Sequence, residues 1–203
     1  MLKKLIFLIG VCFSCAFALQ DPVVFMQEVT NDVLIDLNKL ANNDKNDALY
    51  EIINKKILLH VDIEFMARWV VGRKAWNDAT KKQQEDFIQV FTKLLSRTYS
   101  STLLVFKDRQ IKYYRTGSSD YKTASRIQII CEIQQSGDKQ SINKDPIKGI
   151  YQMHLVKENW MIFDVLVEGV SMLKGLQAQY EQVIAREGID GATVLIQKKL
   201  TGE

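Results

Sequence analysis

The sequence predicts an α+β domain in which helices pack on an antiparallel or mixed sheet of about four strands. Apolar residues recur at spacings of three and four over residues 22–104, which is typical of amphipathic helices. They alternate with polar residues over 111–167, as in half-buried strands, and return to helical spacing after residue 172. This order over 203 residues indicates one domain, 19–203, whose sheet is covered mainly on one face.

The first eighteen residues have the three parts of a secretory signal peptide. Met1–Lys4 is basic, Leu5–Phe13 is apolar, and Ala16–Ala18 is a small-x-small cleavage site. We therefore expect export, with cleavage after Ala18. The alternatives are an uncleaved anchor, for which the apolar run is shorter than the roughly 20 residues of a spanning helix, and a lipoprotein acylated at Cys12 or Cys15.

The mature chain is nearly neutral and keeps one cysteine. The sequence has 27 basic and 24 acidic residues, and loss of Lys3 and Lys4 with the signal lowers the net charge from +3 to +1. This balance does not favour nucleic acid as a partner. Cys131 is alone after cleavage, and its place on the apolar side of a predicted strand indicates a buried, inert thiol.

Three helices are expected before residue 72. Asp21 and Pro22 form a favourable helix start, with a capping side chain followed by a preset φ. The apolar spacing then predicts helices over about 22–40, 47–59 and 62–71. Gly72 is expected to end the third of them.

The longest predicted helix covers roughly residues 81–104. Thr80 and Gln83 have the spacing of a capping box, in which each side chain binds the backbone amide of the other residue. The helix then carries a wide apolar stripe, which is expected to face the core. The stripe contains Phe87, Val90, Phe91, Leu94 and Leu95, and Tyr99, Leu103 and Leu104 extend it.

Four strands follow. The first holds Ile111 and Tyr113, the second runs from Arg126 to Gln134, and the third alternates over 151–155. Glu158-Asn159 predicts a tight hairpin into the fourth strand, which begins at Trp160.

The fourth strand is apolar on both faces and leads into a sharp corner. Glu168-Gly169 is expected to turn the chain, and Ser171 to cap the helix that follows. Gly188 is expected to stop that helix and Asp190 to cap a last short one. A strand apolar on both faces requires a cover on each side.

No catalytic or metal-binding constellation is recognisable. His60 and His154 are expected to be solvated, and two histidines with one cysteine supply none of the usual metal-ligand spacings. Gly169–Leu173 lacks the final glycine of a nucleophile elbow. The sequence also contains no Gly-rich phosphate loop, so nothing in it argues for an enzyme or a cofactor.

Three stretches carry a more specific pattern, and they span about residues 62–192. The first is DIEFMARWVVG at 62–72, followed by Trp76 and Ala79-Thr80. The second is the series Phe87, Phe91, Leu94-Leu95, Arg97-Thr98-Tyr99 and Leu103. The third is FDV-V-EGVSM at 163–172, with GIDGA at 188–192 after it. With these motifs the mature chain resembles the MlaC family of periplasmic phospholipid-binding proteins, also known as toluene-tolerance proteins.

The resemblance implies an NTF2-like arrangement in which helices and a curved sheet enclose an apolar cavity for both acyl chains of one phospholipid. It implies a monomeric carrier in the periplasm, with phospholipid as cargo and no cofactor. The implied partners are an outer-membrane lipoprotein complex and an inner-membrane ABC transporter with its periplasmic substrate-binding ring. The implied role is to maintain the lipid asymmetry of the outer membrane.

The expected lipid-binding residues are those on the core-facing sides of these elements. From the helices they are Trp69, Val70, Phe87, Phe91, Leu94, Leu95, Tyr99 and Leu103. From the strands they are Ile129, Cys131, Met153, Leu155, Phe163 and Val165, with Val170 and Met172 at the corner. Arg97 is a candidate for a phosphate at the mouth or for a structural salt bridge.

Two other functions stay open. An NTF2-like enzyme acting on a small apolar substrate would need a carboxylate or histidine facing the cavity, for which Asp164 is the candidate. A periplasmic adaptor that binds only protein is the second.

Overall fold

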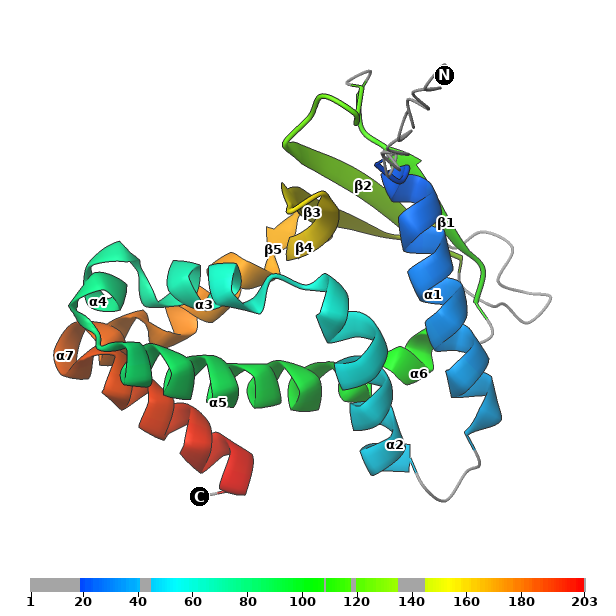
Figure 1. Ribbon diagram of the computed structural model, residues 1–203. Helices are drawn as coiled ribbons and strands as arrows, with labels where there is room; N and C mark the ends of the chain where they lie inside the picture. The colour runs from blue at the N-terminus through cyan, green and yellow to red at the C-terminus, as the bar shows by residue number, and fades with distance from the viewer. Residues whose placement is uncertain (1–18, 41–44, 108, 118–119, 135–144, 203) are drawn as a thin grey trace, which may run out of the picture.

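The computed structural model consists of a helical layer and an open, curved sheet, joined by the segment before α3 and by the β4–α7 corner (Figure 1). The described residues are 19–40, 45–107, 109–117, 120–134 and 145–202. The predicted signal peptide, residues 1–18, lies outside them, as does most of the expected loop at 135–148. No helix among the described residues is long and apolar enough to cross a membrane.

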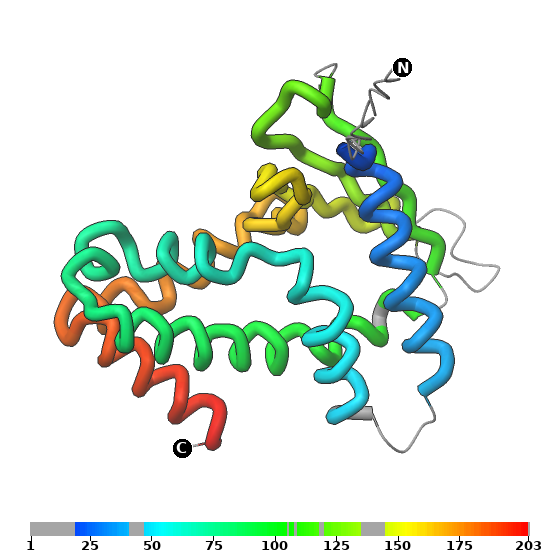
Figure 2. Tube along the Cα trace, viewed as in Figure 1, coloured from blue at the N-terminus to red at the C-terminus, as the bar shows by residue number. Residues whose placement is uncertain are grey.

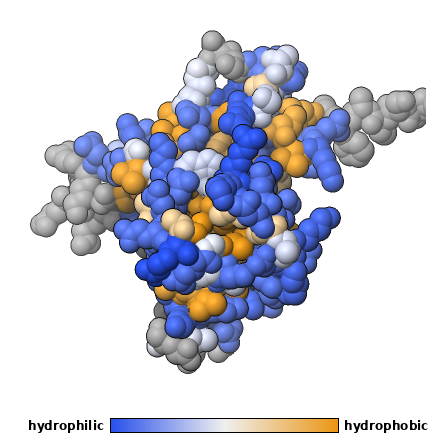
Figure 3. Space-filling view, turned by 90° about the vertical axis from the view of Figure 1, so that its left-hand side faces the viewer, coloured by the Kyte–Doolittle hydropathy of each residue, from blue (hydrophilic) through white to orange (hydrophobic). Residues whose placement is uncertain are grey.

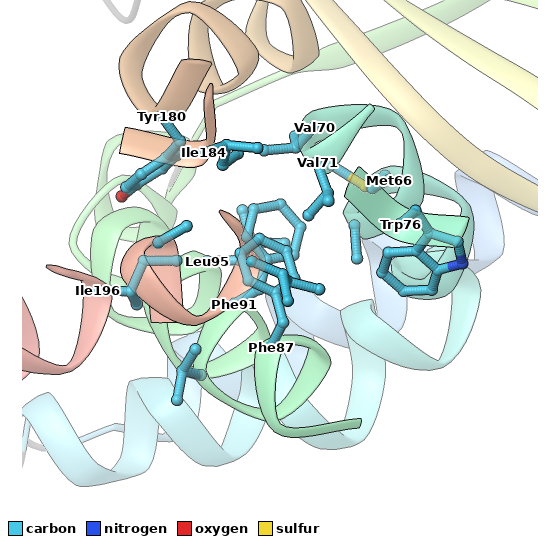
Figure 4. Close-up of a cluster of buried hydrophobic side chains, with 14 of the residues drawn as sticks. Met66, Val70, Val71, Trp76, Phe87, Phe91, Leu95, Tyr180, Ile184 and Ile196 are labelled. Atoms are coloured by element: carbon cyan, nitrogen blue, oxygen red, sulfur yellow. The ribbon is translucent and has the colours of Figure 1, made fainter. Parts of the chain in front are cut away.

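The helical layer has its own core. Its elements are α3 (Ile63–Val71), α4 (Arg73–Asp78), α5 (Lys81–Ser100) and α7 (Met172–Thr201). Phe87 and Phe91 of α5 are fully buried and stack at a centroid distance of 5.5 Å. Figure 4 shows them among side chains of α3 and α7, including Val70 and Ile184. The predicted capping box at Thr80 and the termination of α3 at Gly72 (φ 81°) are both confirmed.

The first helices differ in detail from the sequence prediction. Helix α1 (Pro22–Lys39) begins at the predicted Asp21 cap. The single helix expected over 47–59 is wrong beyond Ile52, because α2 (Lys45–Ile52) passes into a π-helix, Ile53–Ile57, and a 3₁₀ turn, Leu58–His60. The wider π turn brings Ile53, Ile57 and Leu58 onto one wall of the cavity described below.

The helix expected to run to residue 104 also ends earlier. Helix α5 stops at Ser100, and a separate short helix, α6 (Leu103–Phe106), follows. Helix α4, which the sequence analysis did not predict, fills the interval between Gly72 and the Thr80 cap.

The sheet is an antiparallel meander in the order β1-β2-β3-β4-β5. The strands are β1 (Ile111–Arg115), β2 (Arg126–Ile133), β3 (Ile147–Val156), β4 (Asn159–Val167) and β5 (Val170–Ser171). Helix α1 lies beside β1, as the blue and green tubes of Figure 2 show. The α+β class and the sheet of about four strands are confirmed, since β5 adds only two residues at the edge.

The chain turns from β4 into α7 as predicted. Glu168 and Gly169 have φ of 49° and 81°, and the Ser171 side chain accepts a hydrogen bond from the Lys174 amide. Gly188 breaks α7 with non-helical angles, φ 68° and ψ −163°. Asp190 lies within α7 rather than at the start of a separate helix, and its carboxylate accepts a hydrogen bond from Gln83 Nε2 at 2.6 Å.

Candidate functional site

An apolar cavity of about 420 Å³ lies between the concave face of the sheet and the helices. Its wall is almost entirely hydrocarbon, which suits an apolar ligand of considerable length. On the sheet side it is lined by Cys131, Ile133, Ile147, Gly149, Tyr151, Ile162, Val165 and Val167. On the helical side it is lined by Ile53, Ile57, Leu58, Met66, Leu95, Tyr99, Leu103, Phe106, Met172 and Leu176.

A smaller lobe of about 100 Å³ continues beneath α1. It adds Met26, Val33 and Leu37 of α1 to the wall. The two spaces share six residues, which therefore mark their junction: Ile57, Leu103, Phe106, Cys131, Tyr151 and Ile162. The cavity thus has two lobes that meet at the middle of the sheet.

The few polar groups in this wall are mostly paired within the protein. Asp164 is 5% exposed, and its carboxylate accepts hydrogen bonds from Ser171 Oγ (2.6 Å) and the Leu173 amide (3.0 Å). Tyr113 Oη lies 2.6 Å from Thr30 Oγ1, in a hydrogen bond between β1 and α1. Cys131 is buried, as expected, and this burial raises the pKa of its thiol to about 11.

A second groove, of about 750 Å³, lies between α4 and the break in α7. Figure 3 views this side of the molecule, where much of the surface is hydrophilic and apolar side chains form smaller patches. The groove is lined partly by charged residues, including Arg73, Lys74, Glu181, Glu187 and Asp190. Hydrocarbon placed there would desolvate these charges, so the smaller but apolar cavity is the better candidate site.

The family model for MlaC protein matches residues 27–198. The chain belongs to the MlaC family. Two curated relatives agree with this assignment. The intermembrane phospholipid transport system binding protein MlaC of Haemophilus influenzae is 22% identical over 182 residues, covering 86% of this chain and 80% of the relative. The toluene tolerance protein ttg2D of Pseudomonas putida is 24% identical over 176 residues, covering 85% and 77%.

A solved structure shows the same fold for this MlaC family member. The phospholipid-binding protein of Ralstonia solanacearum, determined in complex with a phospholipid, superposes with a TM-score of 0.76. The match covers 88% of this chain and 96% of that chain at 18% identity.

Sixteen residues were expected to bind lipid, and the structure brings six of them together in the cavity wall. These six are Leu95, Tyr99, Leu103, Cys131, Val165 and Met172. Five others, Trp69, Val70, Phe87, Phe91 and Leu94, belong to the helical core. Ile129, Met153 and Leu155 pack in the core of the sheet.

The remaining two lie elsewhere for distinct reasons. The register between β3 and β4 shifts between Gln152 and Met153, so that Phe163 is an extra residue in β4. This bulge places Ile162 and Val165 on the cavity wall, while Phe163 packs against Phe65 and His154. Val170 is 70% exposed at the tip of the corner.

Several wall residues were missed in the sequence. Tyr151 alternates with Met153 and Leu155, which the sequence analysis includes among the expected lipid-binding residues. The period of two therefore places Tyr151 on the same strand face and was enough to predict it. Ile162 was missed because strict alternation from Phe163 assigns it to the other face, and the bulge is not visible in the sequence. The π-helical residues Ile53 and Ile57 gave no signal beyond their apolar character.

The histidines are not solvated as expected. His154 Nε2 lies 2.8 Å from Asp62 Oδ2, and its ring packs edge-on against Phe65 at 4.9 Å. His60 packs edge-on against Phe25, and burial lowers its pKa. In the described part of the chain, no group of three His, Cys, Asp or Glu side chains is suitable for a metal ion.

Arg97 is not among the residues that line the cavity. Its guanidinium donates to the Leu200 carbonyl near the end of α7. Arg97 therefore joins α5 to the C-terminal turn of α7.

Proposed function

We propose that this protein is a periplasmic carrier that binds one phospholipid by its acyl chains in the two-lobed cavity. The observation that carries the proposal is the almost entirely hydrocarbon wall of the cavity between sheet and helices. The names of the Haemophilus and Ralstonia proteins, which refer to phospholipid transport and phospholipid binding, support it.

Physical chemistry explains why such a carrier needs a cavity. Two acyl chains hold roughly 30 methylenes, and exposing them to water at about 0.8 kcal/mol each costs about 25 kcal/mol. A dry apolar wall removes most of this cost, so release into water is negligible. Cavity and bilayer are both apolar, so the free-energy difference between them is small.

Direction must then come from partners. We propose that the protein shuttles phospholipid between an outer-membrane lipoprotein complex and the periplasmic ring of an inner-membrane ABC transporter, and thereby maintains outer-membrane asymmetry. ATP hydrolysis by the transporter would supply the free energy for net movement, so the carrier itself requires no catalytic group or cofactor.

The enzyme alternative depends on Asp164, and its contacts favour a structural role. Both carboxylate oxygens accept hydrogen bonds from the Ser171–Leu173 segment. The Asp164→Asn variant distinguishes the two readings, because a carrier keeps its bound lipid with this substitution, whereas an enzyme loses turnover. Phospholipid carriage that disappears in a folded Asp164→Asn variant would count against the carrier interpretation.

Native mass spectrometry of protein purified without detergent tests the proposal. We expect a one-to-one adduct with the mass of a phospholipid. Val165→Trp and Met172→Trp fill the cavity and should abolish the adduct, whereas Gln128→Trp, at an exposed position of β2, should retain it. A wild-type protein free of lipid after gentle purification would refute the proposal.

A further inference from the structure

Tyr151 has a distinctive position in the cavity. It lies in the middle of β3, between Ile129 of β2 and Val165 of β4 in the sheet register. It lines both lobes, so it stands at their junction. Its ring lies 6.3 Å from that of Tyr113, the tyrosine already paired with Thr30.

The Tyr151 hydroxyl has no hydrogen-bond partner among the described residues. Within the described chain, the one side-chain oxygen or nitrogen that is both unpaired and inaccessible is Tyr180 Oη. Tyr151 Oη is not in that inaccessible class, and its residue lines both lobes, so we infer that the hydroxyl reaches the cavity. An unpaired hydroxyl facing an apolar space is unfavourable until a ligand supplies an acceptor.

This hydroxyl is a neutral donor. Burial raises the pKa of the Tyr151 phenol well above its ordinary value, so it stays protonated across the physiological range. A neutral donor in hydrocarbon surroundings fits a neutral acceptor better than a phosphate, whose charge would lose its hydration there. The cationic residue in the wall, Lys148, is exposed and lines only the larger lobe.

We propose that Tyr151 donates a hydrogen bond to an acyl ester carbonyl of the bound phospholipid and makes the cavity selective for ester-linked lipid. This inference rests on the proposed function. In a diacyl phospholipid the ester carbonyls are the neutral acceptors next to the point where the two chains separate. The junction of the lobes is the place where two chains would diverge.

Tyr99 is the other phenol of the wall without a hydrogen-bond partner in the described residues. It comes from α5 and lines the larger lobe alone. It is therefore away from the junction, and its hydroxyl is not expected to contribute to this selectivity.

The test compares two lipids that differ only in the linkage. Delipidated protein is titrated with dipalmitoyl phosphatidylglycerol and with its dihexadecyl diether analogue, each in competition with a fluorescent phospholipid. The ester lipid should bind about five-fold more tightly to the wild type, the effect of one neutral hydrogen bond. Tyr151→Phe should bind both lipids equally, whereas Tyr114→Phe, at an exposed position of β1, should keep the preference.

The outcomes separate this inference from the function on which it rests. Equal binding of both lipids by the wild type, or an unchanged preference in Tyr151→Phe, overturns the inference while the carrier function stands. Failure of the wild type to bind either lipid overturns the carrier function and the inference with it. If Tyr151→Phe does not fold, the wild-type comparison still tests the inference, because equal binding of both lipids overturns it.

Discussion

Asp164 Oδ1 accepts a hydrogen bond from the Leu173 amide at 3.0 Å and so ties β4 to the first turn of α7. Oδ2 of the same carboxylate accepts from Ser171 Oγ, which in turn accepts from the Lys174 amide. The corner after the fourth strand is therefore held by one buried carboxylate. It fixes the angle at which α7 leaves the sheet and with it one end of the cavity wall, at Met172.

Removal of this carboxylate should destabilise the whole domain. Asp164→Ala leaves the buried Leu173 amide without a partner, and we expect a loss of about 3 kcal/mol in the free energy of unfolding. Ser171→Ala removes the cap and one hydrogen bond to Asp164 Oδ2 but leaves the Leu173 amide paired, and it should cost about 1 kcal/mol. Urea unfolding of both variants measures the difference, and equal losses would show that Asp164 has no role beyond the Ser171 contact.

The bond between Tyr113 and Thr30 should control how firmly α1 is held on the sheet. Tyr113→Phe removes the 2.6 Å contact and should lower stability by about 1 kcal/mol. Because α1 covers the smaller lobe, its amides should exchange with deuterium faster in this variant. Tyr114→Phe on the same strand serves as the control, and unchanged exchange in α1 of Tyr113→Phe would contradict the assignment.

Cys131 should be protected from thiol reagents by both burial and protonation. The pKa of the Cys131 thiol is raised to about 11. The thiolate fraction of the native protein is therefore small below pH 9 and rises as the pH approaches the pKa. The raised pKa also means that native stability is fully present below the unfolded pKa and falls as the pH rises above it. The rate of iodoacetamide labelling, in protein lacking residues 1–18, measures the accessibility and ionisation of the Cys131 thiol.

Labelling at pH 8 should be slow for the native protein, slower still with lipid bound, and fast in urea. Rapid native labelling at pH 8 would show that the thiol is open to solvent.

Gly149 offers a substitution that fills the cavity from the sheet side. A β-carbon there would lie 3.7 Å from the Leu166 carbonyl oxygen and 3.9 Å from Cys131 Cβ, both ordinary contacts. We therefore expect Gly149→Leu to fold, because the strand accommodates a β-carbon at residue 149 and this residue lines the open cavity. Its side chain occupies ligand space, so phospholipid affinity should fall at least ten-fold.

Gln128→Leu, an exposed position of β2, is the control for added apolar surface. Normal lipid affinity in Gly149→Leu would place the cargo elsewhere.

The caps and turns were predictable because their chemistry is local. Each capping side chain accepts a hydrogen bond from a backbone amide no more than three residues away, so the sequence shows these pairs directly. The capping residues are Asp21, Thr80 and Ser171. The choice of lining residues was not local. The helical stripe of α5 contains Phe87, Phe91, Leu95 and Tyr99, which all pack in or against the helical core, but only the last two also line the cavity.

The strand faces were misread for a similar reason. Alternation is a reliable guide until a bulge inserts one residue, and then every assignment beyond the bulge changes sides. Phe163 is that inserted residue. Nothing in its own neighbourhood distinguishes it, because the register that creates the bulge is set by pairing with β3.

Photo-crosslinking with a phospholipid that carries a diazirine on one acyl chain tests the central claim most directly. The account predicts that the label attaches to peptides containing Leu103, Cys131, Tyr151 or Val165, from the walls of the two lobes. It predicts no label in the groove at Arg73, Lys74 and Glu181–Asp190. Label concentrated in that groove, or spread evenly over the surface, would contradict the account.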